Sequence, residues 1–179
     1  MHVFRCQICG DPYLGATRPS HCPFCGAHAN FIVPVQDYRD FKDVSTDKSR
    51  ANLEAALELE ISNSQFYRSA AQVGDDEPTK QMFRALAKIE AEHASTICKW
   101  LGIDKPASIM EVGKANESML ENVQESRTRE ENASAFYAKA AGEAMEKGVA
   151  KFFRALVEIE KDHIKLDQQA LARLAIQLA

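Results

Sequence analysis

The sequence has no long hydrophobic run and no strong excess of charge of either sign. Across its 179 residues, no apolar stretch approaches the length of about 20 residues that a membrane span needs. Its first residues also lack the apolar core of a signal peptide. The formal net charge of −4 is too small to favour nucleic acid or an anionic membrane as a partner. We therefore expect a cytoplasmic protein with neither of these partners.

Cysteine is scarce over most of the chain. Of five cysteines, four fall within the first 25 residues and only Cys98 lies elsewhere. An odd number with this clustering argues against a disulfide framework and for a metal site in a reducing compartment. The four form two Cys-x-x-Cys knuckles, each followed by glycine: Cys6, Cys9, Cys22 and Cys25. Four thiolates suit a tetrahedral site for zinc or a single iron, and the residues alone leave that choice open.

An internal repeat organises the rest of the chain. Residues 60–93 and 130–163 match at an offset of 70 residues. Each copy contains a glutamate, a tyrosine seven residues later, and a Glu-x-x-His pair whose two side chains share one helix face. The matched residues are Glu60 and Glu130, Tyr67 and Tyr137, Glu90 and Glu160, and His93 and His163.

These acidic residues and histidines occupy positions in apolar helical stripes, where core side chains belong. A buried carboxylate costs several kcal/mol unless it is paired or bound to a cation. Two helices giving one Glu each and two giving Glu-x-x-His each form the ligand set of a dinuclear site in a four-helix bundle. Carboxylates with imidazoles favour iron or manganese over zinc. Tyr67 and Tyr137 are either core aromatics or phenols bonded to ligand carboxylates.

The pattern predicts three segments. A small β-rich metal domain occupies residues 1–35 and depends on its metal for stability, and residues 36–47 are a polar linker. Residues 48–179 form an all-α four-helix bundle, with helices expected at about 48–73, 78–101, 115–147 and 149–178. The segment from Gly102 to about Lys114 is too long for a tight turn. It therefore predicts a crossover between parallel second and third helices, as in ferritin-like bundles.

Taken together, the two cysteine knuckles and the six repeat-related carboxylates and histidines resemble the rubrerythrins. These are ferritin-like diiron proteins that carry a rubredoxin-like FeS4 domain. In most members that domain is C-terminal, whereas here the knuckles come first, so the chain resembles a reverse rubrerythrin. The resemblance implies a non-haem diiron peroxidase that reduces hydrogen peroxide to water in oxidative-stress defence. Electrons would come from iron at the four cysteines.

The resemblance also implies partners. An external electron donor, such as rubredoxin or a reductase, would link the reaction to NADH. A homodimer or larger homo-oligomer would bring one subunit's FeS4 site near its partner's diiron site.

One position departs from the family pattern. A second carboxylate usually stands three residues after the glutamate at position 130, and this chain has Ala133 there. The four-Glu, two-His set that remains is closer to that of ferritins. This leaves two alternatives to a peroxidase: a ferroxidase or oxygen reductase, and a ferritin-like iron-binding protein with a structural zinc ribbon. Manganese or zinc could also enter the helical site of the isolated protein.

Overall fold

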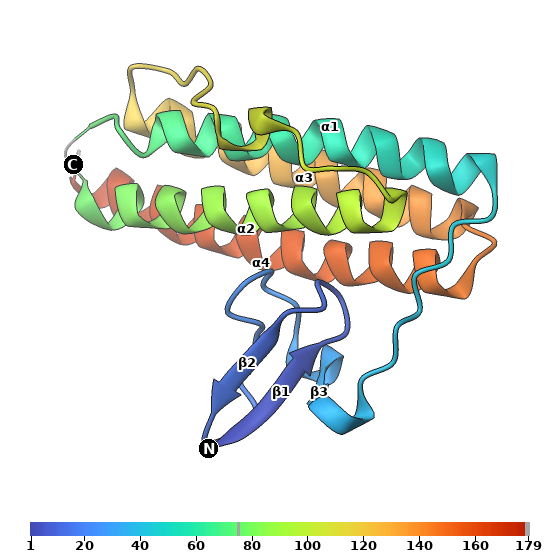
Figure 1. Ribbon diagram of the computed structural model, residues 1–179. Coiled ribbons are helices and arrows are strands. Elements are labelled where there is room, and N and C mark those ends of the chain that lie inside the picture. Colours follow the sequence, from blue (N-terminus) through green and yellow to red (C-terminus); the bar gives the residue numbers. More distant parts are fainter. Residues whose placement is uncertain (75, 178–179) are drawn as a thin grey trace.

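The computed structural model describes residues 1–74 and 76–177 (Figure 1). The chain opens with three short strands, β1 (His2–Cys6), β2 (Pro12–Gly15) and β3 (Ile32–Pro34). They form an antiparallel sheet in the order β2-β1-β3, in which Phe4 of β1 lies opposite Tyr13 on one side and Pro34 on the other. A sheet this small buries little apolar surface, so we expect its stability to depend on metal at the knuckles.

Four long helices follow: α1 (Asp47–Ala70), α2 (Glu77–Leu101), α3 (Met119–Glu143) and α4 (Lys147–Gln177). The first three begin next to residues that cap their free backbone N–H groups. Thr46 accepts from the Ser49 amide, Asp76 from the Thr79 amide, and Ser118 from the Glu121 amide. Gly102 ends α2 in the left-handed conformation, with φ of 69°, as glycine does at many helix ends.

The crossover between α2 and α3 contains a short 3-10 turn, Ala107–Met110, and is fastened along α1. Ser64 Oγ donates to the Ile109 carbonyl at 3.2 Å, and Gln65 Nε2 donates to the Ser108 carbonyl at 2.8 Å. The crossover returns along the bundle, so α2 and α3 run parallel (Figure 1). The expected ferritin-like connection is therefore confirmed.

The helix expected over residues 115–147 is wrong at both ends, because α3 runs from Met119 to Glu143. At its start, the Asn122 side chain turns back to the backbone of Asn116, accepting from its amide at 2.8 Å and donating to its carbonyl at 2.9 Å. These bonds hold the preceding residues in a loop. At its end, Ala144 is extended. The other bounds differ less, with α1 ending at Ala70 and α4 beginning at Lys147, and the expected end at Leu178 lies outside the described residues.

Glu146, between α3 and α4, anchors the start of α1. Its carboxylate accepts hydrogen bonds from the amides of Ser45 and Thr46 at 2.8 and 2.7 Å and from Ser49 Oγ at 2.5 Å. Burial opposes ionisation, but these bonds to Ser49, Ser45 and Thr46 hold the pKa of Glu146 well below its ordinary value. The turn between the last two helices thus fixes the point where the bundle begins.

The repeat is visible in the packing of the bundle. The ring of Tyr67 stacks on Phe83 at 5.8 Å, and the ring of Tyr137 stacks on Phe153 at 5.9 Å. The β-rich domain lies across α2 and α4, with its metal knuckles toward the helices (Figure 1). The expected fold class, an all-α ferritin-like bundle preceded by a small β-rich domain, is confirmed. Within residues 1–74 and 76–177, no helix combines the length and the apolar character needed to cross a membrane.

Candidate metal centres

The four knuckle cysteines converge on one point and are buried. The Sγ atoms of Cys6 and Cys25 are 3.7 Å apart, and those of Cys9 and Cys22 are 3.8 Å apart. A tetrahedral ion with metal–sulfur bonds of about 2.3 Å would separate its ligands by about 3.8 Å. The thiol positions therefore fit a single tetrahedral ion.

The two knuckles share one backbone geometry. Gly10 and Gly26 have φ of 83° and 76°, and their amides donate to the carbonyls of Cys6 and Cys22, each at 3.0 Å. Glycine takes this left-handed conformation with little strain. Gly26 has a second reason to be glycine, because an added Cβ would lie 3.3 Å from the side chain of Ile159 in α4. The second knuckle therefore presses directly on the bundle.

The second centre lies inside the bundle. Two groups of four buried side chains each surround a position for an ion, and they share Glu90 and Glu160. Glu60 and His93 complete one group, and Glu130 and His163 complete the other. The structure thus brings together all six residues of the predicted dinuclear site.

The shared carboxylates are oriented as bridges. The oxygens of Glu90 point to different histidines, Oε2 lying 3.1 Å from His93 Nδ1 and Oε1 lying 3.2 Å from His163 Nδ1. The oxygens of Glu160 also point to different histidines, Oε1 lying 3.9 Å from His93 Nδ1 and Oε2 lying 2.9 Å from His163 Nδ1. Glu90 and Glu160 would therefore be available to both ions of a metal pair, and each ion would also have one further glutamate and one imidazole within its group. Paired catalytic ions in other enzymes are held about 3.5–4 Å apart.

The four buried carboxylates of this pocket favour the binding of cations. Within the described part of the chain, six of its buried atoms make no hydrogen bond: Glu60 Oε2, Glu90 Oε1, Glu130 Oε2, both carboxylate oxygens of Glu160, and His163 Nδ1. Some of these atoms lie at ion-pair distance from one another, as His163 Nδ1 does from Glu160 Oε2, but buried polar atoms without a hydrogen bond are rare in native proteins. Two divalent ions would satisfy them and offset the four carboxylate charges. The residues present therefore fit a dinuclear metal centre.

The pKa shifts of the acidic residues and histidines in the pocket also indicate that the pocket favours positive charge. Burial and the neighbouring Glu90 raise the pKa values of Glu60 and Glu160 well above their ordinary range. Burial opposes protonation of the histidines, yet Glu60 raises the pKa of His93 and Glu130 raises that of His163. Protons are thus drawn to the positions where metal ions would bind.

Both predicted tyrosines contact candidate ligands. Tyr67 Oη donates a hydrogen bond to Glu130 Oε1, and Tyr137 Oη donates to Glu60 Oε1 at 2.5 Å. Each phenol reaches across the bundle to the glutamate of the other repeat. Of the two readings left open by the sequence, the geometry matches the phenol that orients a ligand carboxylate.

A buried polar chain beyond Tyr67 was missed by the sequence reasoning. Ser126 Oγ lies 3.2 Å from Tyr67 Oη and 2.8 and 2.9 Å from the two oxygens of Asp167. Burial raises the pKa of Asp167 to about 8. A hydrogen-bond network follows, in which the Ser126 hydroxyl lies between the Asp167 carboxylate and the Tyr67 hydroxyl, and Tyr67 donates to Glu130.

This hydrogen-bond network has no counterpart in the other repeat, because Ala56 and Ile97 stand at the positions that correspond to Ser126 and Asp167. The departure from the repeat at these two positions was therefore the signal in the sequence that could have revealed the network.

We predict that Tyr67→Phe lowers the melting temperature by about 2–4 °C more than Tyr137→Phe. The first variant loses the Ser126–Tyr67 hydrogen bond as well as the bond to a candidate ligand carboxylate, whereas Tyr137→Phe loses only the bond to the carboxylate, a difference of about 1 kcal/mol. Thermal denaturation of the two metal-loaded variants side by side measures it, and equal shifts would contradict it.

The two centres meet at His93. Its Nε2 lies 2.9 Å from the backbone carbonyl of Cys25. A carbonyl only accepts, so Nε2 carries a proton, and Nδ1 is the nitrogen that faces Glu90 and Glu60 and would be available to a metal ion. Lys99 strengthens the same interface by donating to the Cys9 carbonyl at 3.0 Å. One side chain of the dinuclear pocket thus touches the backbone of the cysteine site.

Four further residues lie outside the ligand groups of both centres. Ala133 is buried and offers no seventh ligand, and Cys98 is a buried free thiol outside the cysteine cluster. Glu131 is exposed and pairs with Arg127 at 2.8 Å. His2 is exposed on β1.

The fold and its pockets define a class: a ferritin-like bundle with a dinuclear carboxylate pocket, preceded by a four-cysteine metal domain. Comparison with known proteins gives the family. Residues 51–171 match the family model described as Rubrerythrin. Reverse rubrerythrin-1 of Clostridium acetobutylicum is 31% identical over 114 residues, which cover 57% of this chain and 63% of that protein.

A solved structure of a hypothetical protein from Pyrococcus furiosus is similar, with a TM-score of 0.62 and 21% identity. The similarity covers 72% of this chain and 91% of that chain, and at this identity it shows the fold alone. The chain belongs to the rubrerythrin family, and with its cysteine domain first it is of the reverse type. The aligned region spans less than two thirds of the Clostridium protein's length. Membership supports iron binding.

Proposed function

We propose that the protein is a diiron peroxidase that reduces hydrogen peroxide to water. Its candidate iron ligands are Glu60, Glu90, His93, Glu130, Glu160 and His163, and Cys6, Cys9, Cys22 and Cys25 hold a third iron that relays electrons. When bound, two irons in the pocket would supply Lewis acidity and two electrons to a small oxidant. The observation that carries the proposal is the hydrogen bond from His93 Nε2 to the Cys25 carbonyl, which joins the two centres. A zinc domain with a purely structural role would have no need to contact a redox pocket.

The chain's own residues would support this reaction in three ways. The six candidate ligands are buried, and this burial keeps bulk water away from the site. Tyr67 and Tyr137 fix the terminal carboxylates through their phenol protons. Reduction of H2O2 to two waters consumes two electrons and two protons, and the chain Asp167–Ser126–Tyr67 can deliver a proton to Glu130 Oε1.

Electron supply follows from the interface. The Cys25 carbonyl accepts from His93 Nε2, so one imidazole and one hydrogen bond separate the cysteine site from the pocket. An external donor, a rubredoxin or a reductase linked to NADH, would refill the cysteine site. The contact lies within one chain, so the proposed homodimer or larger homo-oligomer is not needed for the relay.

A ferroxidase or oxygen reductase is the second candidate, and Ala133 favours it. With alanine there, the pocket has no additional carboxylate to exchange onto a metal when its charge changes. The symmetric set of four glutamates and two histidines is then fixed, as in ferritins.

The test compares oxidants on the anaerobically reduced protein carrying about three irons per chain. We expect peroxide to reoxidise both centres much faster than an equal concentration of oxygen, with about one peroxide consumed per two electrons. Faster reaction with oxygen, or no response of the cysteine-site spectrum to peroxide, would instead support the ferroxidase or storage function.

A further inference from the structure

A third cluster of metal-binding side chains lies outside both centres, where the β-rich domain meets α4. It comprises His21, His28 and Asp162, whose donor atoms all lie within 4.8 Å of one another. His28 Nε2 is 2.6 Å and His21 Nε2 is 3.5 Å from the same oxygen, Asp162 Oδ2. We call these three residues the interdomain cluster.

The backbone brings the two histidines together before the bundle contributes. His21 and His28 pair across an antiparallel bridge that closes the second cysteine knuckle, and their rings meet edge to face at 4.8 Å. The Cys22 amide, next to His21, donates to the Ala27 carbonyl at 2.7 Å. Any ion that orders the knuckle at Cys22 and Cys25 therefore also fixes the spacing of these imidazoles.

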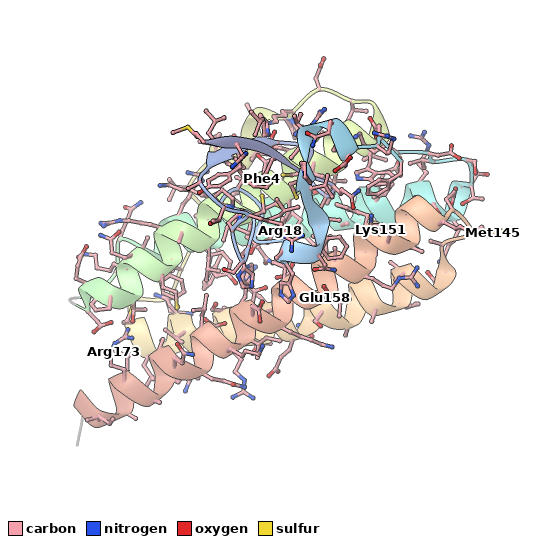
Figure 2. All side chains as sticks on the ribbon, turned by 90° about the horizontal axis from the view of Figure 1, so that it is seen from below. Phe4, Arg18, Met145, Lys151, Glu158 and Arg173 are labelled. Atoms are coloured by element: carbon pink, nitrogen blue, oxygen red, sulfur yellow. The ribbon has the colours of Figure 1, made fainter. Side chains whose placement is uncertain are left out.

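Asp162, the residue that α4 contributes to the cluster, is also held in a fixed orientation. Lys165 Nζ holds Asp162 Oδ1 at 2.8 Å, which leaves Oδ2 free to face both imidazoles. Glu158, one turn earlier on α4, places Oε2 3.7 Å from His28 Nδ1. Figure 2, seen from the side of the β-rich domain, shows Glu158 at the edge of that domain. A second carboxylate is therefore close to the cluster.

Two imidazoles and one carboxylate with open positions form a donor set for divalent transition ions. With bonds of about 2.0–2.1 Å, tetrahedral ligands lie about 3.3 Å apart. The His21–Asp162 separation matches this value, and the His28–Asp162 hydrogen bond would have to open by about 0.7 Å. Because the three side chains are between 31% and 52% exposed, an ion could enter from solvent and keep water on its remaining positions.

We propose that His21, His28 and Asp162 form a third metal site, for an exchangeable divalent transition ion such as Zn2+ or Fe2+. Its ligands come from both domains, so a bound ion fastens the cysteine domain onto α4. His28 is three residues from Cys25, whose carbonyl contacts His93. The site thus clamps the interface that joins the two main centres.

The test counts zinc ions on protein whose other two centres are already filled with iron. The native chain is dialysed against micromolar Zn2+, and both metals are then measured. We expect one additional Zn2+ per chain with no loss of iron. His21→Gln and His28→Gln should each abolish the additional zinc. His2→Gln, an exposed histidine on the same domain outside the cluster, should retain it.

A second measurement reports the clamp. Zn2+ should raise the melting temperature and slow proteolysis of the linker at residues 38–46 in the native protein and in His2→Gln, but not in His28→Gln. Glutamine can still bond to Asp162, so its failure to respond separates metal binding from the ordinary hydrogen bond. Absence of additional zinc on the native protein, zinc bound only as iron is released, or equal binding by His28→Gln would overturn the proposal. None of these readouts depends on peroxidase activity.

Discussion

Replacing Glu90 with alanine is expected to lower peroxide turnover by more than about 100-fold while leaving the visible spectrum of the cysteine-bound iron unchanged. Glu90 is the one side chain of α2 whose two oxygens face both histidines, at 3.1 and 3.2 Å. Its loss removes a ligand from both metal positions at once. Removal of a residue that merely supports a ligand costs 10–100-fold, so loss of a shared ligand should cost more.

Three measurements on one preparation check this expectation: iron content, the visible spectrum and donor-linked peroxide turnover. Iron should fall from about three toward one per chain. Glu131→Ala is the matched control, because Glu131 is an exposed glutamate whose only close partner in the described structure is Arg127. Retained turnover in Glu90→Ala would remove the pocket from the reaction, and an equal loss in Glu131→Ala would point to general instability.

The dinuclear pocket could be assembled from the sequence because two independent periodicities agree on it. The helical stripe places Glu90 and His93 inward, and the offset of 70 residues repeats that placement at Glu160 and His163. Each buried carboxylate is costly alone, so four of them in register imply a shared charge partner. Which carboxylates bridge is a matter of the relative rotation of four helices, and no local pattern encodes it.

The ends of α3 show where local patterns are weak. Its apolar stripe predicts a helix extending to about Lys147, but Glu146 forms several hydrogen bonds with the start of α1 and the chain turns at Ala144 instead. At the other end, Ser118 caps the helix and Asn122 bonds back to Asn116. Contacts between residues about 100 positions apart thus decided one boundary, and a side chain's preference for backbone atoms decided the other.

The contact between the two centres could not be foreseen for a different reason. Its acceptor is the backbone carbonyl of Cys25, a group that every residue carries and no sequence pattern marks. Gly26 offers a partial signal, since its missing Cβ lets the knuckle approach Ile159. That glycine is also needed for the turn itself, so its second role becomes visible only once the domains are placed together.

Substituting zinc for iron at the four cysteines, with iron kept in the helical pocket, is expected to abolish steady-state peroxide turnover without disturbing the fold. Zinc and iron take the same tetrahedral thiolate geometry, with metal–sulfur distances near 2.3 Å, and the sulfur separations of 3.7 and 3.8 Å suit either ion. The contact between Cys25 and His93 should therefore persist. Zinc has no accessible second oxidation state, so an electron supplied by the donor could not be held at Cys6, Cys9, Cys22 and Cys25.

Such protein can be produced in zinc-rich, iron-poor medium and its pocket then filled anaerobically with Fe(II). The informative comparison is between one turnover and many. The pre-reduced zinc form should consume about one peroxide per chain at the native rate and then stop, because the pocket's two electrons are spent and none arrive through His93. Melting temperatures within about 2 °C of each other would show that the domain is intact. Sustained turnover by the zinc form would mean that the donor reaches the helical pocket directly. The Cys25–His93 contact would then be a structural joint, and the cysteine domain would be a zinc ribbon fastened to a ferritin-like oxidase.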